Sequence, residues 1–112
     1  MLPRWIRYYV YRIGGLKTSS MKINPGCTFI GDKVEINEGA FLNRNVTVVC
    51  NEKVLIGKNV SIAFNVLITT ATHEISTEHK RAGKTVRFPI EIGDGTWIGA
   101  NATILPGVKI GN

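Results

Sequence analysis

The chain has 112 residues, of which 44% are hydrophobic and 20% charged, a composition typical of one soluble globular domain with a modest core. No apolar run approaches the length that spans a bilayer, and the two cysteines lack the CxxC spacing of a zinc site. The net charge of +6 favours an anionic partner, and nucleic acid, acidic lipid and a phosphate-bearing cofactor would all satisfy it.

Residues 1–13 have the pattern of an amphipathic helix, which the glycine pair after residue 13 ends. Its apolar face consists of Leu2, Trp5, Ile6, Tyr9, Val10 and Ile13. Two roles stay open for this helix: it covers the open end of the domain, or it lies on an anionic membrane surface through its arginines and aromatics. We divide the chain into this helix with its linker, residues 1–19, and a domain of residues 20–112.

A period of six residues begins at Ile30, with aliphatic residues at every sixth position and small or aliphatic residues at the fifth place of each six. Neither a helix nor an alternating strand sustains this period. Short flat strands joined by tight corners do, with one inward aliphatic side chain per side and glycine where the backbone turns. The pattern breaks between Val48 and Ile56, where two additional residues predict an outward bulge around residues 50–53, and it then resumes as far as Ile68.

Residues 73–89 lack the repeat and are polar and basic, so we expect one long loop that is extruded from the coil. Long loops in compact domains are usually functional or disordered. The histidine at the root of this loop, His73, favours function, whereas His79 inside the loop is interpreted as a solvated surface residue.

The repeat is cleanest from Ile92 to Asn112, where isoleucine returns at every sixth residue, usually followed by glycine. Three sides of six residues make a turn of about 18 residues. The chain then holds a partial first coil, two interrupted coils, one nearly clean coil and the first three residues of another. We therefore expect an all-β parallel solenoid that ends in mid-coil, so that either the chain is truncated or something outside it covers the exposed strand edge.

The hexapeptide run, together with Thr-Ala-Thr-His at 70–73, Phe-Pro-Ile at 88–90 and Trp-Ile-Gly at 97–99, resembles the left-handed β-helix acyltransferases. The similarity covers residues 28–112, and it is to the maltose/galactoside O-acetyltransferase branch and its relatives that decorate capsular and exopolysaccharides. The resemblance implies a left-handed coil, which is an exception to the usual right-handed crossover. It also implies a homotrimer with acetyl-CoA, the acyl donor, in clefts between neighbouring subunits; no metal is expected.

His73 matches the catalytic histidine of that family. An alcohol is too weakly acidic to attack a thioester unless it loses its proton as the bond forms, and imidazole can take that proton near neutral pH. The family attacks the thioester directly, so no nucleophilic serine or cysteine is required. Without the surrounding motif, a single histidine at a loop root is more often only a polar residue.

The other site residues follow from the same resemblance. Asn43 matches an acceptor-binding asparagine, although a structural role at a solenoid corner, in left-handed geometry, is equally open. Asn51 stands where the galactoside enzymes carry an acceptor-binding aspartate, which puts the same sugar specificity in doubt. Trp97 matches a tryptophan beside the acetyl end of CoA, or it fills space between subunits. Ala100 matches a position whose backbone N–H contacts the cofactor near the thioester.

The sequence therefore predicts an acetyl-CoA-dependent O-acetyltransferase that acts on a sugar or polysaccharide hydroxyl, in the cytoplasm or peripherally at the inner face of the membrane. The alternative is a non-catalytic trimeric scaffold or a truncated acyltransferase without a complete acyl-CoA site, since the family carries much of that site in coils that would follow Asn112. A γ-class carbonic anhydrase needs three histidine ligands, and the chain has two histidines. Nucleic acid is not an expected partner because the basic residues are scattered and form no recognition motif.

Overall fold

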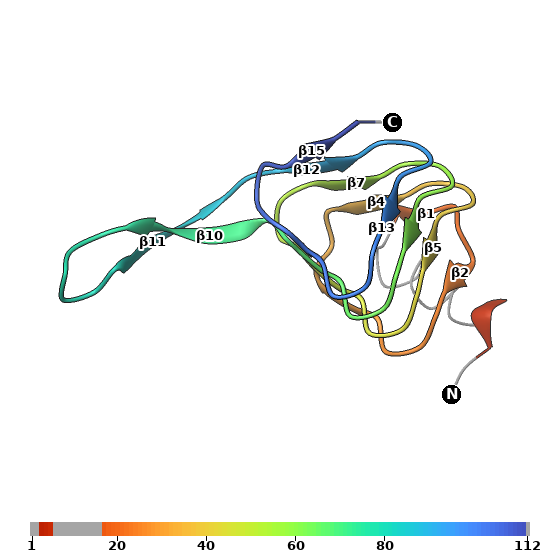
Figure 1. Cartoon of the computed structure of the whole chain (residues 1–112), viewed down its shortest axis with the longest axis horizontal. Helices are drawn as coiled ribbons and strands as arrows, with labels where there is room; N and C mark the ends of the chain where they lie inside the picture. Colours follow the sequence, from red (N-terminus) through yellow and green to blue (C-terminus); the bar gives the residue numbers. More distant parts are fainter. Residues whose placement is uncertain (1–2, 6–16, 112) are drawn as a thin grey trace.

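The computed structural model describes residues 3–5 and 17–111, in which the backbone winds into a three-sided prism of parallel strands (Figure 1). Each coil contributes one short strand to each side. Sheet A consists of β1 (Lys17–Thr18), β4 (Val34–Ile36), β7 (Val54–Ile56), β12 (Ile90–Ile92) and β15 (Lys109–Ile110). Sheet B consists of β2 (Lys22–Ile23), β5 (Phe41–Leu42), β8 (Ser61–Ile62) and β13 (Trp97–Ile98). Sheet C consists of β3 (Thr28–Gly31), β6 (Thr47–Cys50), β9 (Leu67–Thr69) and β14 (Thr103–Ile104). The predicted all-β parallel solenoid is confirmed.

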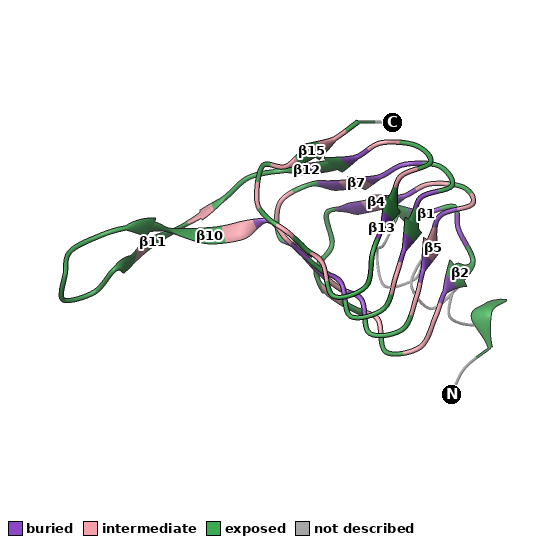
Figure 2. Cartoon of the chain, viewed as in Figure 1, coloured by how far each residue is buried: buried purple, intermediate pink, exposed green. Residues whose placement is uncertain are grey.

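The core of the prism is a stack of buried, mostly aliphatic side chains, one or two from most strands. Figure 2 colours the backbone of these buried residues purple. Burial of one such side chain stabilises the fold by about 1.5–3 kcal/mol. The sixth-position residues of the two central coils are all fully buried: Ile36, Leu42, Val48, Ile56, Ile62 and Ile68. The six-residue repeat therefore corresponds to the side chains that face the axis of the prism.

The length of a turn is confirmed in the last coil, where Glu91 pairs with Lys109, eighteen positions later. In the interrupted coil the spacing is larger, and Val34 pairs with Val54. The two additional residues do not form the predicted bulge over residues 50–53, because Cys50 is a fully buried residue of β6. They lengthen the corner between sheets C and A instead, where the backbone bends at residues 51 and 52.

Both cysteines are free. Burial raises the pKa of the Cys50 thiol above its ordinary value, so this residue stays protonated at neutral pH. A protonated thiol in the core is not a nucleophile, and Cys50 serves only to fill space.

The first coil departs from the predicted phase by one residue. Phe29 pairs with Val48 and packs against the core, whereas Ile30 pairs with Val49 and is 49% exposed. A shift of one residue turns every side chain of a strand to the opposite face. The prediction that the inward phase begins at Ile30 was wrong because the corner after β3 is also longer than a plain repeat, so counting back in sixes from Ile36 misses the inward position.

The extruded segment predicted at residues 73–89 leaves the prism at the corner between sheets C and A (Figure 1). It is not an irregular loop but an antiparallel hairpin of β10 (Ala71–Ile75) and β11 (Ala82–Arg87). The residues Thr72 and Val86 form one of its cross-strand pairs, and β-branched residues favour this pairing.

Most of the predicted N-terminal helix at residues 1–13 lies outside the described residues. Arg4 and Trp5 are helical, and Trp5 is 57% exposed. The guanidinium of Arg4 lies 5.6 Å from the centre of the Phe41 ring and donates a hydrogen bond of 3.1 Å to Asn24 Oδ1. In the described part of the chain, no helix has the length and apolar character needed to cross a membrane.

The corners of the prism turn through a residue in left-handed backbone geometry, which is glycine or asparagine. These residues are Gly26, Gly39, Asn45, Asn59, Asn65, Gly95, Asn101 and Gly107. Asparagine tolerates this geometry better than other side chains, and glycine does so without steric cost. The prediction that glycine marks the corners is confirmed, and asparagine shares the role.

Gly39→Ala and Gly95→Ala form a matched pair, because both glycines have nearly the same φ, +77° and +76°. A Cβ at residue 95 meets no atom, whereas a Cβ at residue 39 collides with the Asn59 side chain. We expect Gly95→Ala to lower the free energy of unfolding by about 1–2 kcal/mol through backbone strain alone. Gly39→Ala should lower the free energy of unfolding by about 1–3 kcal/mol more than Gly95→Ala does, because of the collision with Asn59. Urea unfolding measures both, and equal losses would show that Asn59 moves aside without cost.

Candidate active site

His73 lies in β10 with its side chain exposed, and the opposite strand orients its ring. Its Nδ1 lies 3.0 Å from the carbonyl oxygen of Gly83. A carbonyl oxygen only accepts hydrogen bonds, so Nδ1 carries the proton and donates it in this contact. The neutral ring therefore has its free lone pair on Nε2, which is the form that a general base requires.

A β-bulge brings the Gly83 carbonyl to this position. The register of the hairpin shifts between His73 and Ile75, and Gly83 lies opposite the shift. A Cβ at residue 83 would lie 2.9 Å from Glu74 O and 2.9 Å from Ser76 Cβ, closer than real contacts. Only glycine fits here without moving the backbone. In the sequence, the sign of this bulge is a glycine close to β-branched residues, in a segment that was interpreted as a loop.

The root of the hairpin is bonded to the coil beneath it, next to Asn51. The Phe88 N–H donates to Thr70 O at 2.9 Å, which closes the hairpin. Thr70 Oγ1 accepts a long hydrogen bond of 3.4 Å from the Glu52 N–H, so the corner that contains Asn51 adjoins the hairpin root. Asn51 is exposed. The structure thus places the predicted acceptor residue Asn51 and the candidate base His73 at the same corner of the prism.

Trp97 and Ala100 lie together on another side of the prism. Trp97 points outward from β13 in sheet B and is 78% exposed. Ala100 begins the next corner, where Asn101 has a φ of +63°. Within residues 3–5 and 17–111, the Ala100 N–H has no hydrogen-bond partner. It is a free backbone donor three residues after an exposed tryptophan.

Asn43 occupies the corner between sheets B and C in an earlier coil and is half-buried. Its Oδ1 accepts hydrogen bonds from the Arg44 N–H at 2.8 Å and from Asn24 Nδ2 at 3.3 Å. The left-handed residue of this corner is Asn45, so Asn43 does not have the left-handed role considered for it. Its side-chain oxygen nevertheless stabilises the corner, which leaves the Nδ2 group as the one able to contact a ligand.

One copy of the chain does not bring all five predicted residues together. His73 and Asn51 belong to the corner between sheets C and A, whereas Trp97, Ala100 and Asn43 belong to sheet B and its corner with sheet C. Sheet C lies between the two groups. A single site can contain both groups only if a second copy of the chain supplies one of them.

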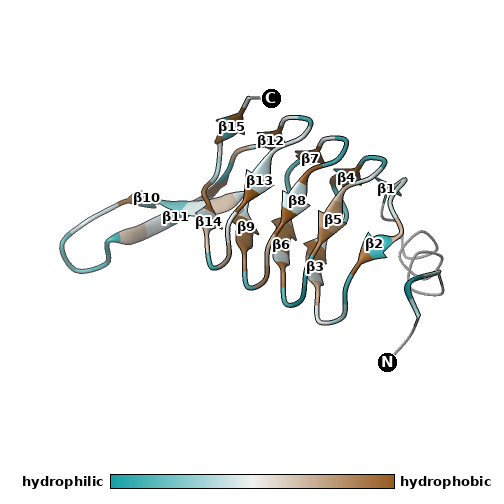
Figure 3. Ribbon diagram, turned by 45° about the vertical axis from the view of Figure 1, so that its right-hand side comes forward, coloured by the Kyte–Doolittle hydropathy of each residue, from teal (hydrophilic) through white to brown (hydrophobic). Residues whose placement is uncertain are grey.

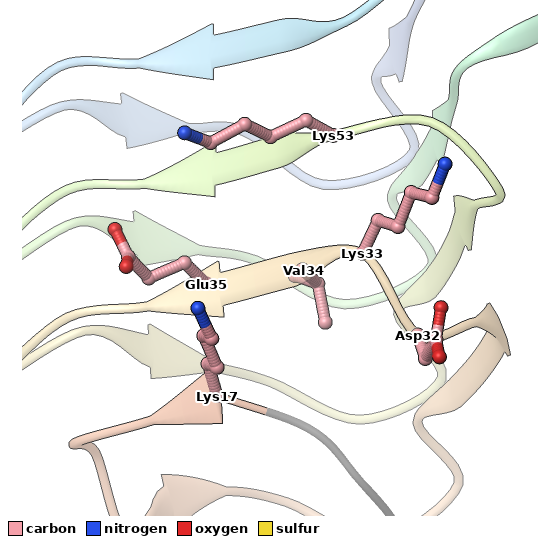
Figure 4. Close-up of a pocket in the computed structure, with 6 residues that line it drawn as sticks. All are labelled: Lys17, Asp32, Lys33, Val34, Glu35 and Lys53. Atoms are coloured by element: carbon pink, nitrogen blue, oxygen red, sulfur yellow. The ribbon is translucent and has the colours of Figure 1, made fainter.

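A hollow of about 540 Å³ opens on sheet A (Figure 4). It is lined by Lys17, Asp32, Lys33, Val34, Glu35 and Lys53. Three ammonium groups and two carboxylates nearly balance there, and none of the predicted site residues lines it. Among the described residues, no group of three histidine, cysteine, aspartate or glutamate side chains is placed to hold a metal ion.

Comparison with known proteins places this arrangement among acetyltransferases. The bacterial transferase hexapeptide family, of six repeats, matches residues 89–112. The galactoside O-acetyltransferase of Escherichia coli is 39% identical over 82 residues, which are 73% of this chain and 40% of that enzyme. Nodulation protein L of Rhizobium meliloti is 39% identical and aligns with 93% of this chain and 65% of its own length. The chain thus spans less than two thirds of the curated relatives it matches.

A solved structure has the same coil. The crystal structure of a maltose O-acetyltransferase from Clostridium difficile 630 superposes with a TM-score of 0.82 at 28% identity, over 95% of this chain and 58% of that one. This match confirms the left-handed β-helix expected from the family resemblance.

Gly83→Ala should change which ring nitrogen of His73 carries the proton, without unfolding the coil. The added Cβ pushes the bulge apart and withdraws the carbonyl that holds the proton on Nδ1. We expect long-range ¹H–¹⁵N spectra to show the Nδ1–H form in the wild-type protein and a mixture with the Nε2–H form in the variant. Gly111→Ala is the control, because a Cβ there meets nothing. An unchanged tautomer in Gly83→Ala would contradict this account of the ring orientation.

Proposed function

Because the chain has the hexapeptide-repeat β-helix of the galactoside and maltose O-acetyltransferase branch, we propose that it transfers an acetyl group from acetyl-CoA to a hydroxyl of a sugar or polysaccharide. The observation that carries the proposal is the bond from His73 Nδ1 to Gly83 O. That bond keeps Nε2 free to accept a proton, and the side chain is exposed to an incoming acceptor.

The transfer takes place in one complex of donor and acceptor. His73 Nε2 takes the proton as the acceptor oxygen attacks the thioester carbonyl carbon, so that a C–O bond forms and the C–S bond then breaks. The CoA thiolate leaves and receives the proton from the imidazolium. The free N–H of Ala100 supports the negative charge that develops on the carbonyl oxygen, as a backbone donor does in an oxyanion hole. The buried thiol of Cys50 takes no part.

The outer face of sheet C is suited to binding a second copy of the chain. Its outward side chains carry no charge in the described strands: Thr28, Ile30, Thr47, Val49, Leu67, Thr69 and Thr103 (Figure 3). Phe64, at the corner with sheet B, is 49% exposed. Sheet A is different, since Glu91 and Lys109 form an ion pair of 3.5 Å on its outer face. Uncharged faces of this kind are typical of protein interfaces.

A closed homotrimer follows if sheet C of each copy packs beside sheet B of the next, around a threefold axis parallel to the coil. The hairpin at the far edge of sheet C then extends over the sheet B of the neighbouring copy. In this arrangement His73 of one copy approaches Trp97 and Ala100 of the next. The acetyl-CoA site therefore lies between two copies, which explains why one copy separates the two groups of residues.

His73→Asn should reduce acetyl transfer about 10²–10⁴-fold, the usual contribution of a positioned general base. The fold should persist because the side chain is exposed on the hairpin. Steady-state rates with a panel of sugar acceptors measure the effect, and calorimetry with acetyl-CoA should give similar affinity for both proteins. Nearly wild-type turnover in the variant would exclude His73 as the base. A wild-type chain that neither binds nor uses acetyl-CoA would favour the trimeric scaffold.

Mixed trimers test whether the site lies between copies. His73→Asn and Trp97→Ala should each impair turnover, and a mixture assembled from both should recover activity, because some interfaces combine an intact His73 with an intact Trp97. Random assembly predicts roughly a quarter of the wild-type rate. Native mass spectrometry of the same mixture should show trimers. No recovery above the two separate variants would place the complete site within one copy.

A further inference from the structure

The hairpin has two distinct faces, and the face that carries His73 also carries Arg87. The register pairs Ala71 with Arg87 and His73 with Thr85. Directly opposed residues share a face of an antiparallel pair, and the faces alternate along each strand. His73, Thr85 and Arg87 therefore lie on one face, whereas Lys84 and Val86 lie on the other.

Arg87 is the diagonal neighbour of His73 across the strand pair. Diagonal neighbours have Cα atoms about 7–8 Å apart, within reach of long side chains. A molecule of the size of one sugar residue can therefore contact the guanidinium of Arg87 while one of its hydroxyls meets His73 Nε2.

The charge of Arg87 is not neutralised within residues 3–5 and 17–111. Its side chain is exposed, and it takes part in none of the hydrogen bonds or ion pairs between the described residues. The acidic residue near the tip of the hairpin, Glu78, lies 3.7 Å from His79 instead. An unpaired guanidinium beside a general base presents a planar set of donors that fits a carboxylate or phosphate with two parallel hydrogen bonds.

We propose that the acceptor is anionic, a sugar that carries a carboxylate or phosphate group, and that Arg87 binds this group so that a neighbouring hydroxyl reaches His73. The inference rests on the proposed O-acetyltransferase activity and adds the class of acceptor. The other basic residues of the hairpin do not share this position: Lys80 and Arg81 lie beyond the bulge toward the tip, and Lys84 is on the opposite face.

The test compares sugar acceptors that carry an anionic group with one that is neutral. Methyl glucuronide and glucose 1-phosphate supply the carboxylate and the phosphate, and methyl glucoside is the neutral reference. We expect the wild-type kcat/KM for at least one anionic acceptor to exceed that of the neutral one about tenfold or more, the size of a charge-assisted hydrogen-bond pair. Arg87→Gln should abolish this preference, and Arg87→Lys should retain part of it. Lys84→Gln, on the opposite face, should behave as wild type.

Two kinetic results would overturn the inference: equal use of charged and neutral acceptors by the wild-type protein, or a rise in the KM for acetyl-CoA alone in Arg87→Gln, which would assign Arg87 to the donor. Calorimetric binding of methyl glucuronide to the wild-type and Arg87→Gln proteins decides the matter independently of turnover. Equal affinities would refute the role of Arg87. Tighter binding by the wild type with no acetyl transfer to any acceptor would support the anion site and refute the proposed function.

Discussion

The stacking of inward aliphatic side chains in register is the constraint on which the rest of this structure depends. Each strand is only a few residues long and has little stability by itself, but its backbone pairs with adjacent coils while its inward side chains join a continuous core. A position that slips by one residue would point outward, so the register must be kept at every turn. The corners serve this requirement, because glycine and asparagine in left-handed geometry turn the chain from one sheet to the next.

Most of the coil could be predicted from the sequence, because the inward positions repeat and their burial leaves a visible period. The predictions failed where the period is interrupted. Ile30 was assigned inward because the longer corner after β3 has no repeat to reveal its length, and Phe29 takes that place. The hairpin was interpreted as a loop because its strands are exposed on both faces, so its alternation is not marked by hydrophobic residues. The position of His73 was predicted from a motif, but the bond that orients its ring was not, since that bond depends on a bulge and on a backbone carbonyl.

The outward positions are free of the constraint that governs the inward ones, and the three sheets use them differently. Sheet A carries opposite charges in register, as the pairing of Glu91 with Lys109 shows, and such a face is readily hydrated. Sheet C carries threonine and aliphatic residues at the equivalent positions, a pattern that solvation alone does not explain. One repeating backbone therefore presents one face with opposite charges and another without charge, and the distinction lies wholly in side chains that the six-residue period does not specify.

The hairpin can carry chemistry because its insertion leaves the coil undisturbed. The chain leaves after Thr70 and returns so that Val54 pairs with Ile90, as if no segment intervened, while the bond from the Phe88 N–H to Thr70 O closes the root. The cost of closing this loop is offset by the pairing of its own two strands. Because the partner that orients His73 belongs to the same hairpin, the orientation of the proposed base depends on local pairing and not on the coil. The coil contributes the place at which the hairpin emerges, and in the proposed trimer that place decides which surface of the neighbouring copy the proposed base can reach.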